Sequence, residues 1–279
     1  MNRIKQIEVL TWYYTHFGAD YSLEVPAEGF GGWQKTMLPL CPEHTALCVM
    51  HAWDCPDRAE FSGIWSVVEY LPRASEILGN RMPSLLKAFR ESGVRVIHIE
   101  SGGYVQKYEA YQQTQGLIRG FLPPAREAGN AAPDAVYETL RAFRAAHVNP
   151  GEENRGDIER AWKIRDIHES VKPLPGEYMV TESDELQAVC GLHDINHLIY
   201  VGFALNFCLL MSPGSMLDMS RRGFLCSTVK EVTTAVENDF SARNEWGKQM
   251  ALWNTAVSFG FVYEQADLEK ALRASGARA

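Results

Sequence analysis

The chain has 279 residues, of which 46% are hydrophobic and 22% are charged, as in a folded globular protein with a substantial core. Its formal net charge of −8 excludes a surface that coats nucleic acid, because no stripe of Lys and Arg is available to neutralise phosphates. Gln6 and Glu8 come too early for the apolar core of a secretory signal, so we expect a cytoplasmic protein. The six cysteines form no CxxC pair, which indicates reduced thiols and no zinc ribbon.

Residues 1–43 carry many aromatic residues and turn formers but show no clear period. We predict that they form an ordered arm that packs on the body or on a neighbouring subunit, because a disordered tail would hold fewer large apolar groups. Residues 44–279 are predicted to form one domain. It begins with a buried strand, Thr45–Met50, and continues through a helix over Leu78–Ser92 to a second strand, Val94–Ile99.

Residues 104–172 are too long for a single crossover between strands. Two amphipathic patterns predict helices over Pro133–His147 and Asp157–Val171, so this segment is interpreted as a helical insertion. The charged residues of the second helix are most simply a solvent-facing surface. A lid or a subunit contact is the alternative.

Four further strands and helices complete the domain in alternation. The predicted strands are Tyr178–Thr181, His197–Gly202, Phe224–Val229 and Phe259–Tyr263, and the predicted helices are Glu185–His193, a helix from Cys208, Glu245–Val257 and Asp267–Leu272 with Asp267 as its cap. Strands that alternate with helices are joined by right-handed crossovers in a parallel sheet. We therefore predict a three-layer α/β/α, Rossmann-like domain with about six mostly parallel strands.

Cys208 follows the buried strand that begins at His197, at the place where the next helix should begin. Ligands bind at the carboxyl ends of strands in open α/β sheets, and free N–H groups at a helix start favour a thiolate. The competing interpretation is an inert cysteine packed beside a buried strand. The apolar run is too short and too interrupted to cross a membrane.

Two segments resemble the isochorismatase-like cysteine hydrolases: Ala46-Leu-Cys-Val-Met-His51, where the family has ALxVxD, and Gly202-Phe-Ala-Leu-Asn-Phe-Cys208, where it has GxxTxxC. The resemblance extends from about residue 44 to about residue 272. It implies a Rossmann-like sheet, amidase-type chemistry by an Asp–Lys–Cys triad, and a cis peptide around Phe203, Ala204 and Leu205 that shapes the oxyanion site. It also implies a homo-oligomer.

The sequence departs from this family at two of the three triad positions. His51 stands where the family has its aspartate, and Glu182 lies where its lysine is expected. We hypothesise that Cys208 is the nucleophile, His51 its base, Glu182 the group that orients the base, and the N–H groups of 204–208 the oxyanion donors. Alternatively, His51 bonds only to backbone and Glu182 faces solvent in a turn. Asp54 either caps a loop or replaces the lost aspartate.

The predicted crevice beside Cys208 is lined by Trp53, Tyr104, Phe203 and Leu205, with Asp54 and Ala204 as further contacts, which favours a small, partly apolar or aromatic substrate. No metal site is expected. Some relatives carry an Asp/His cluster where this chain has Glu100-Ser-Gly-Gly103, and His51, Asp54 and His98 offer only a remote alternative. The sequence contains no Gly-rich phosphate loop between a strand and a helix, and no cofactor is expected.

The most direct functional prediction is a cysteine hydrolase that cleaves an amide-type C–N bond of a small molecule through Cys208 and a rearranged triad. The alternative is a catalytically degenerate member of the family that serves as a small-molecule binding or assembly protein. Cleavage of a vinyl ether, as in isochorismate hydrolysis, is a weaker third interpretation. The expected partners are a small-molecule substrate and further copies of the chain, with neither nucleic acid nor membrane.

Overall fold

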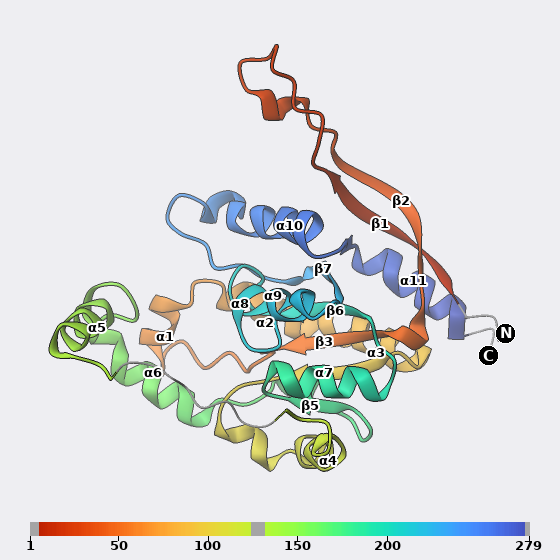
Figure 1. Cartoon of the computed structure of the whole chain (residues 1–279). Helices are drawn as coiled ribbons and strands as arrows, with labels where there is room; N and C mark the ends of the chain where they lie inside the picture. Colours follow the sequence, from red (N-terminus) through yellow and green to blue (C-terminus); the bar gives the residue numbers. More distant parts are fainter. Residues whose placement is uncertain (1–5, 124–131, 277–279) are drawn as a thin grey trace.

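The computed structural model describes residues 6–123 and 132–276. Residues 1–5 of the predicted arm and residues 124–131 of the predicted insertion lie outside this part. Most of the N-terminal stretch that was considered as a secretory signal therefore also lies outside it. The strands of the described chain form one mixed sheet in the order β2-β1-β8-β7-β6-β3-β4-β5 (Figure 1). The strands are β1 (Ile7–Thr15), β2 (Gly32–Leu40), β3 (Thr45–Met50), β4 (Arg95–Ile99), β5 (Tyr178–Val180), β6 (His197–Gly202), β7 (Leu225–Thr233) and β8 (Val262–Tyr263).

The strands from β3 to β8 run parallel to one another, and β3 lies between β6 and β4 near the middle of the sheet. All six residues of β3 are buried, which explains why its sequence is a continuous apolar run. Leu47 and Val49 pack on one side of the sheet, whereas Ala46, Cys48 and Met50 pack on the other. The sheet is therefore covered on both faces, as predicted for a three-layer α/β/α domain.

Helices α2, α3 and α11 cover one face of the sheet, and α7, α8, α9 and α10 cover the other. The helices are α1 (Ser62–Val67), α2 (Leu71–Glu76), α3 (Met82–Ser92), α4 (Glu109–Ile118), α5 (Ala135–His147), α6 (Glu152–Ile164), α7 (Ser183–Leu192), α8 (Cys208–Met211), α9 (Met216–Arg221), α10 (Trp246–Ser258) and α11 (Gln265–Gly276). A π-helical turn, Ile77–Arg81, joins α2 to α3. Short 3₁₀ turns lie at Pro26–Gly29, Pro42–His44, Gly103–Lys107, Glu169–Val171 and Ala242–Asn244.

The sheet has eight strands, so the prediction of about six was too low. All six strands of the prediction are present, and the two additional ones, β1 and β2, form an antiparallel hairpin within residues 1–43. Trp12 of β1 pairs with Val262 of β8, which joins the hairpin to the sheet. Most residues of both strands are partly or fully exposed, so the sequence shows little of the alternation that reveals a half-buried strand.

One helix prediction needs correction. The predicted helix Asp157–Val171 is shifted, because α6 begins at Glu152 and ends at Ile164, and Ile167 then pairs with Trp53 in an isolated bridge. The helix predicted from Cys208 is present as a single turn that ends at Ser212-Pro-Gly214, and α9 follows it.

The cap predicted at Asp267 also differs, because this residue lies within α11. There its carboxylate binds Lys35 of β2 at 2.7 Å. This long-range ion pair was not visible in the local sequence.

The hairpin projects from the body of the molecule (Figure 1). Phe17 and Tyr21 near its tip are 74% and 86% exposed. Helix α5 buries none of its residues, and Leu140 and Phe143 on it are exposed. These apolar surfaces are the places where the predicted homo-oligomer would form, and oligomerisation stays a prediction.

Within the described residues, no helix has the length and apolar character needed to cross a membrane.

Candidate functional site

Four neighbouring parallel strands end at the same edge of the sheet. The last residues of β6, β3, β4 and β5 lie beside one another in the order Gly202, Met50, Ile99, Val180. The next residue of three strands bonds to its neighbour: Phe203 N–H donates to Met50 O, His51 N–H to Ile99 O, and Glu100 N–H to Val180 O, at 3.0–3.2 Å. The segments that carry Cys208, His51, Glu100 and Glu182 therefore start from adjacent positions of one sheet edge.

The turn between β6 and Cys208 is built on a close approach of two strands. Gly202 has φ = 120°, and a Cβ there would lie 1.9 Å from the carbonyl oxygen of Met50, so only glycine fits. The Phe203–Ala204 peptide bond is cis, at the place that the family resemblance implied. Asn206 fixes the end of the turn, since its side chain both donates to Val236 O and accepts from Val236 N–H. Contacts with β3 and with the segment after β7 therefore fix the backbone turn that leads to Cys208.

Cys208 is half-buried at the first position of α8. Within the described chain, its N–H group donates to no backbone carbonyl, whereas the neighbouring N–H groups of Phe207 and Leu209 both donate to Ala204 O. This free N–H is available to a developing oxyanion. One turn of helix adds only a small dipole, so the predicted polarisation of the thiol by a helix start is weak.

His51 is buried and adopts φ = 52°, in the left-handed region where histidine is one of the more tolerated residues. Its ring stacks on Trp53 with centroids 4.5 Å apart, and its Nδ1 atom is buried without a hydrogen-bond partner in the described chain. Burial, assisted by the charge of Arg165, lowers the pKa of His51 to about 3. The imidazole is therefore neutral at physiological pH. It can form a hydrogen bond to a ligand, but it is a very weak base.

Glu100 is the main functional candidate that the sequence analysis missed. Its carboxylate is 1% exposed, accepts hydrogen bonds from Trp53 Nε1 at 2.6 Å and from the Tyr104 hydroxyl, and has one oxygen, Oε1, without a partner in the described chain. Burial raises the pKa of Glu100 to about 7, although these hydrogen bonds and Arg165 oppose the rise. The available signal was its position, because Glu100 follows β4 as His51 follows β3.

Glu182 stands at the start of α7, one strand beyond Glu100. Its N–H donates to Glu185 Oε2 at 3.3 Å in a capping box. Partial burial, with the neighbouring carboxylates of Glu185, Asp184 and Asp218, raises the pKa of Glu182. No hydrogen bond joins the side chains of Cys208, His51 and Glu182 in the described chain. The hydrogen-bonded triad of the sequence hypothesis is not formed in this structure.

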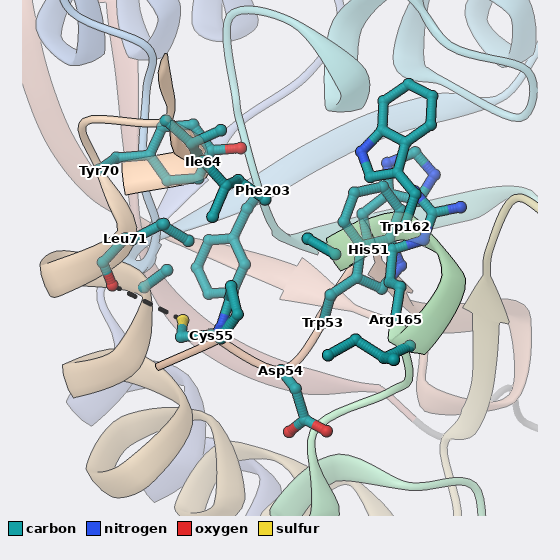
Figure 2. Close-up of a pocket in the computed structure, with 15 residues that line it drawn as sticks. His51, Trp53, Asp54, Cys55, Ile64, Tyr70, Leu71, Trp162, Arg165 and Phe203 are labelled. Carbon is teal, nitrogen blue, oxygen red and sulfur yellow. Dashed lines mark hydrogen bonds between the residues drawn. The ribbon is translucent and has the colours of Figure 1, made fainter. Parts of the chain in front are cut away.

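Two cavities meet at His51. The first, here the apolar cavity, has a volume of about 210 Å³ and lies between two groups of side chains (Figure 2). On one side are His51, Trp53, Trp162 and Arg165, and on the other are Cys55, Ile64, Tyr70, Leu71 and Phe203. The second, here the polar cavity, has a volume of about 560 Å³ and is lined by His51, Glu100, Glu182, Ser101, Thr181 and Ser212 among others. His51 therefore borders an apolar surface on one side and a polar surface on the other.

The predicted substrate-binding residues lie in three different surroundings. Trp53, Asp54 and Phe203 line the apolar cavity, with the Asp54 carboxyl pointing away from the rings (Figure 2). Tyr104 lies behind this wall, bonded to Glu100 and to Trp53. Ala204 and Leu205 are buried, and neither they nor Cys208 borders the two cavities within the described chain.

The residues considered for a metal are separated in the structure. His98 is fully buried within β4 and bonds to Glu177 at 3.0 Å, away from His51 and Asp54. Among the described residues, no three His, Cys, Asp or Glu side chains lie close enough to hold a metal ion.

Comparison with known proteins gives structural similarity at low sequence identity. The chain is similar to a cysteine hydrolase from Pseudomonas syringae pv. phaseolicola (TM-score 0.46, 13% identity, 85% of this chain and 96% of that one). It is also similar to an N-carbamoylsarcosine amidase from Thermoplasma acidophilum (TM-score 0.41, 15% identity, 79% and 96%) and to a nicotinamidase from Staphylococcus aureus (TM-score 0.40, 13% identity, 79% and 98%). No family model and no curated protein matches the sequence. The function is therefore inferred from this chain's own residues.

Proposed function

We propose that this protein is a hydrolase that cleaves an amide-type C–N bond of a small molecule, with Cys208 as the nucleophile and Glu100 as the acid–base group. Glu100 takes the role that the sequence hypothesis gave to His51. The observation that carries the proposal is the buried carboxyl group of Glu100, which has a free oxygen and borders the polar cavity.

A general acid–base group works best when its pKa is close to the pH at which the enzyme operates. The pKa of Glu100, about 7, meets this condition, and that of His51, about 3, does not. At neutral pH Glu100 is present both as the carboxylate and as the acid. It can therefore take up a proton in one step and return it in the next.

The segments that carry the two reacting groups leave the sheet at strands that are two positions apart. The turn to Cys208 follows β6 and Glu100 follows β4, with β3 between them. Neighbouring strands lie about 4.8 Å apart, so the backbones of β6 and β4 are roughly 10 Å apart where these segments begin. In the proposed reaction the substrate carbonyl and the attacking water lie between the two segments, in front of His51.

The proposed reaction has two steps. The thiol loses its proton to the Glu100 carboxylate and attacks the carbonyl carbon, and the C–N bond breaks as Glu100 returns the proton to the leaving nitrogen. Water then attacks the thioester, Glu100 takes a proton from it, and the thiol is regenerated as the proton returns to the sulfur. The sum is amide plus water giving carboxylic acid plus amine. The free N–H of Cys208 stabilises the oxyanion in both steps.

A second candidate is a small-molecule binding protein without catalysis. Cys208 borders neither cavity within the described chain, and this observation favours binding alone. In that case the apolar cavity holds the ligand, and Cys208 is an inert half-buried thiol.

An assay with a panel of small aromatic and aliphatic amides, in which the released amine is measured, distinguishes the two candidates. We expect Cys208→Ala to abolish turnover and Glu100→Gln to lower kcat/KM by roughly 10²–10⁴-fold. In the native protein kcat/KM should rise with pH through about 7, because only the carboxylate of Glu100 accepts a proton. This limb should be absent in the Glu100→Gln variant.

Cys41→Ser is the matched control, because Cys41 is also half-buried and lies before the first residue of β3, at the end of the strand opposite to the site. Its turnover should equal that of the native protein. If Cys208→Ala retains turnover, or if iodoacetamide labels Cys208 no faster than Cys41, the thiol mechanism is wrong.

A further inference from the structure

Arg165 is a cation at the wall of the apolar cavity with no ion pair in the described chain. Its guanidinium carbon lies 4.0 Å from the ring centroid of Trp53, and its Nη2 atom donates to Ser101 O at 2.7 Å. Nε is buried without a partner, so within the described residues one carbonyl oxygen is the only acceptor for a group with five N–H donors. A guanidinium in apolar surroundings is stabilised by a matching carboxylate, which forms two parallel hydrogen bonds with it.

The chain holds this guanidinium in place through contacts on both sides of Arg165. Asp166 accepts hydrogen bonds from Tyr108 and Lys107, and Ile167 pairs with Trp53. These contacts fix the chain directly after Arg165, where it leaves α6. Gly102, with φ = 104°, makes room on the other side, since a Cβ there would lie 2.6 Å from Arg165 Nη2.

No acidic side chain of the described residues forms an ion pair with Arg165 at the cavity. The Asp54 carboxyl points away from the rings (Figure 2), and Glu100, which interacts electrostatically with Arg165, is buried against Trp53 and Tyr104. Opposite Arg165 the cavity wall consists mainly of apolar and aromatic side chains, including Ile64, Leu71 and Phe203. An acidic group from outside the chain is therefore the missing partner, and it would be attached to an apolar body.

We propose that the ligand of this site is a small carboxylate with an aromatic or branched apolar body, and that Arg165 binds its carboxylate. The inference rests on the proposed function in one respect, since the C–N bond to be cleaved belongs to the same molecule. The substrate class is then an N-acyl or amide derivative that also carries a free carboxylate. The apolar cavity holds its body, and the polar cavity beyond His51 receives the C–N bond.

The test is a binding measurement that needs no turnover. Phenylacetate and phenylacetone have nearly the same shape, but only the first carries a carboxylate. Isothermal titration calorimetry on the full chain should give at least tenfold tighter binding of phenylacetate. Arg165→Met should weaken phenylacetate binding about 30-fold or more and change phenylacetone binding less than about threefold. Arg165→Lys, which keeps the charge but loses the planar fork, should give an intermediate loss.

Arg160→Met is the matched control. Arg160 lies on α6, which ends one residue before Arg165. Like Arg165, it donates to a backbone carbonyl (Glu60 O, 2.7 Å) and lies over an aromatic ring (Phe61, 4.8 Å), but it does not border the cavity. Phenylacetate should bind to this variant as to the native protein. A loss of both probes with Arg165→Lys as well as Arg165→Met would assign Arg165 a structural role and overturn the inference.

The outcomes separate this inference from the proposed hydrolase. Equal affinities for the two probes, or no binding of either, overturn the inference and leave the amide assay to decide on catalysis. Arg165-dependent binding of phenylacetate without hydrolysis of any amide supports the carboxylate site and contradicts the hydrolase.

Discussion

Glu100 and Glu177 lie next to the same pair of strands, the first buried and the second partly buried, and their electrostatic surroundings are opposite. Glu177 precedes β5, and its carboxylate binds Arg90 at 2.6 and 3.0 Å and His98 at 3.0 Å. These partners overcome the effect of burial and lower the pKa of Glu177 to about 2. Glu100 follows β4 and is hydrogen-bonded by neutral groups, the side chains of Trp53 and Tyr104 and the backbone of Ala52. Burial outweighs these bonds and the charge of Arg165, and raises the pKa of Glu100 to about 7.

The difference shows how the fold distinguishes a carboxylate with a fixed charge from one that can exchange a proton near neutral pH. A bidentate arginine fixes the charge of Glu177 and leaves no proton to exchange near neutral pH. The carboxyl of Glu100 retains a proton that it can release, at the edge of the sheet where cavities form. The two groups should also have opposite effects on stability: the free energy of unfolding should fall with rising pH because of Glu100 and increase with rising pH because of Glu177.

The largest expected effect is on the pH dependence of stability through Glu100. Its folded pKa of about 7 exceeds the ordinary value of 4.5, so the folded chain holds the proton more tightly between these pH values. Stability should therefore fall as pH rises from 4.5 through 7, by roughly 3 kcal/mol in total. Urea denaturation across pH 4.5–8 should show this loss in the native protein, and Glu100→Gln should remove it. A loss of the same size in the variant would exclude Glu100 as its source.

A somewhat smaller effect is expected at Glu177. Its folded pKa of about 2 lies below the ordinary value, so its contribution is present above pH 4.5 and is lost as pH falls towards 2. Arg90→Met should lower the free energy of unfolding at pH 7 by about 2 kcal/mol, because the half-buried pair loses its cation.

Lys87→Met provides the control for Arg90→Met on the same helix, α3. Lys87 faces Glu91 at 3.8 Å, and both side chains are exposed. The cost should stay below about 0.5 kcal/mol. Equal losses in the two variants would mean that the Arg90–Glu177 pair adds nothing specific.

The smallest effect concerns Tyr104, whose hydroxyl donates to Glu100. Tyr104→Phe removes a hydrogen bond that favours the carboxylate, so the pKa of Glu100 should rise further, by about one unit. The alkaline end of the Glu100 transition in the pH–stability curve would then move upward. A downward shift would show that the hydroxyl stabilises the protonated acid instead.

The strands at the centre of the sheet could be predicted from the sequence because burial on both faces leaves a continuous apolar run, as in β3 and β6. The turn from Gly202 to Cys208 was also recognisable, since a glycine is required where the backbones of two strands meet. The hairpin strands β1 and β2 were not predicted because only Val9 and Thr11 of β1 and Leu40 of β2 are buried, too few to impose a clear period on the residues.

The sequence by itself determined the alternation of strands and helices, and with it the sheet edge from which the segments that carry Cys208, His51 and Glu100 start. Only the tertiary structure decided what these groups can do. Whether a side chain is neutral or charged depends on burial and on partners distant in the chain, such as Arg165 beside Trp53, or Arg90 beside Glu177. These distances cannot be read from the local sequence, so the protonation states of the site residues follow from the packing.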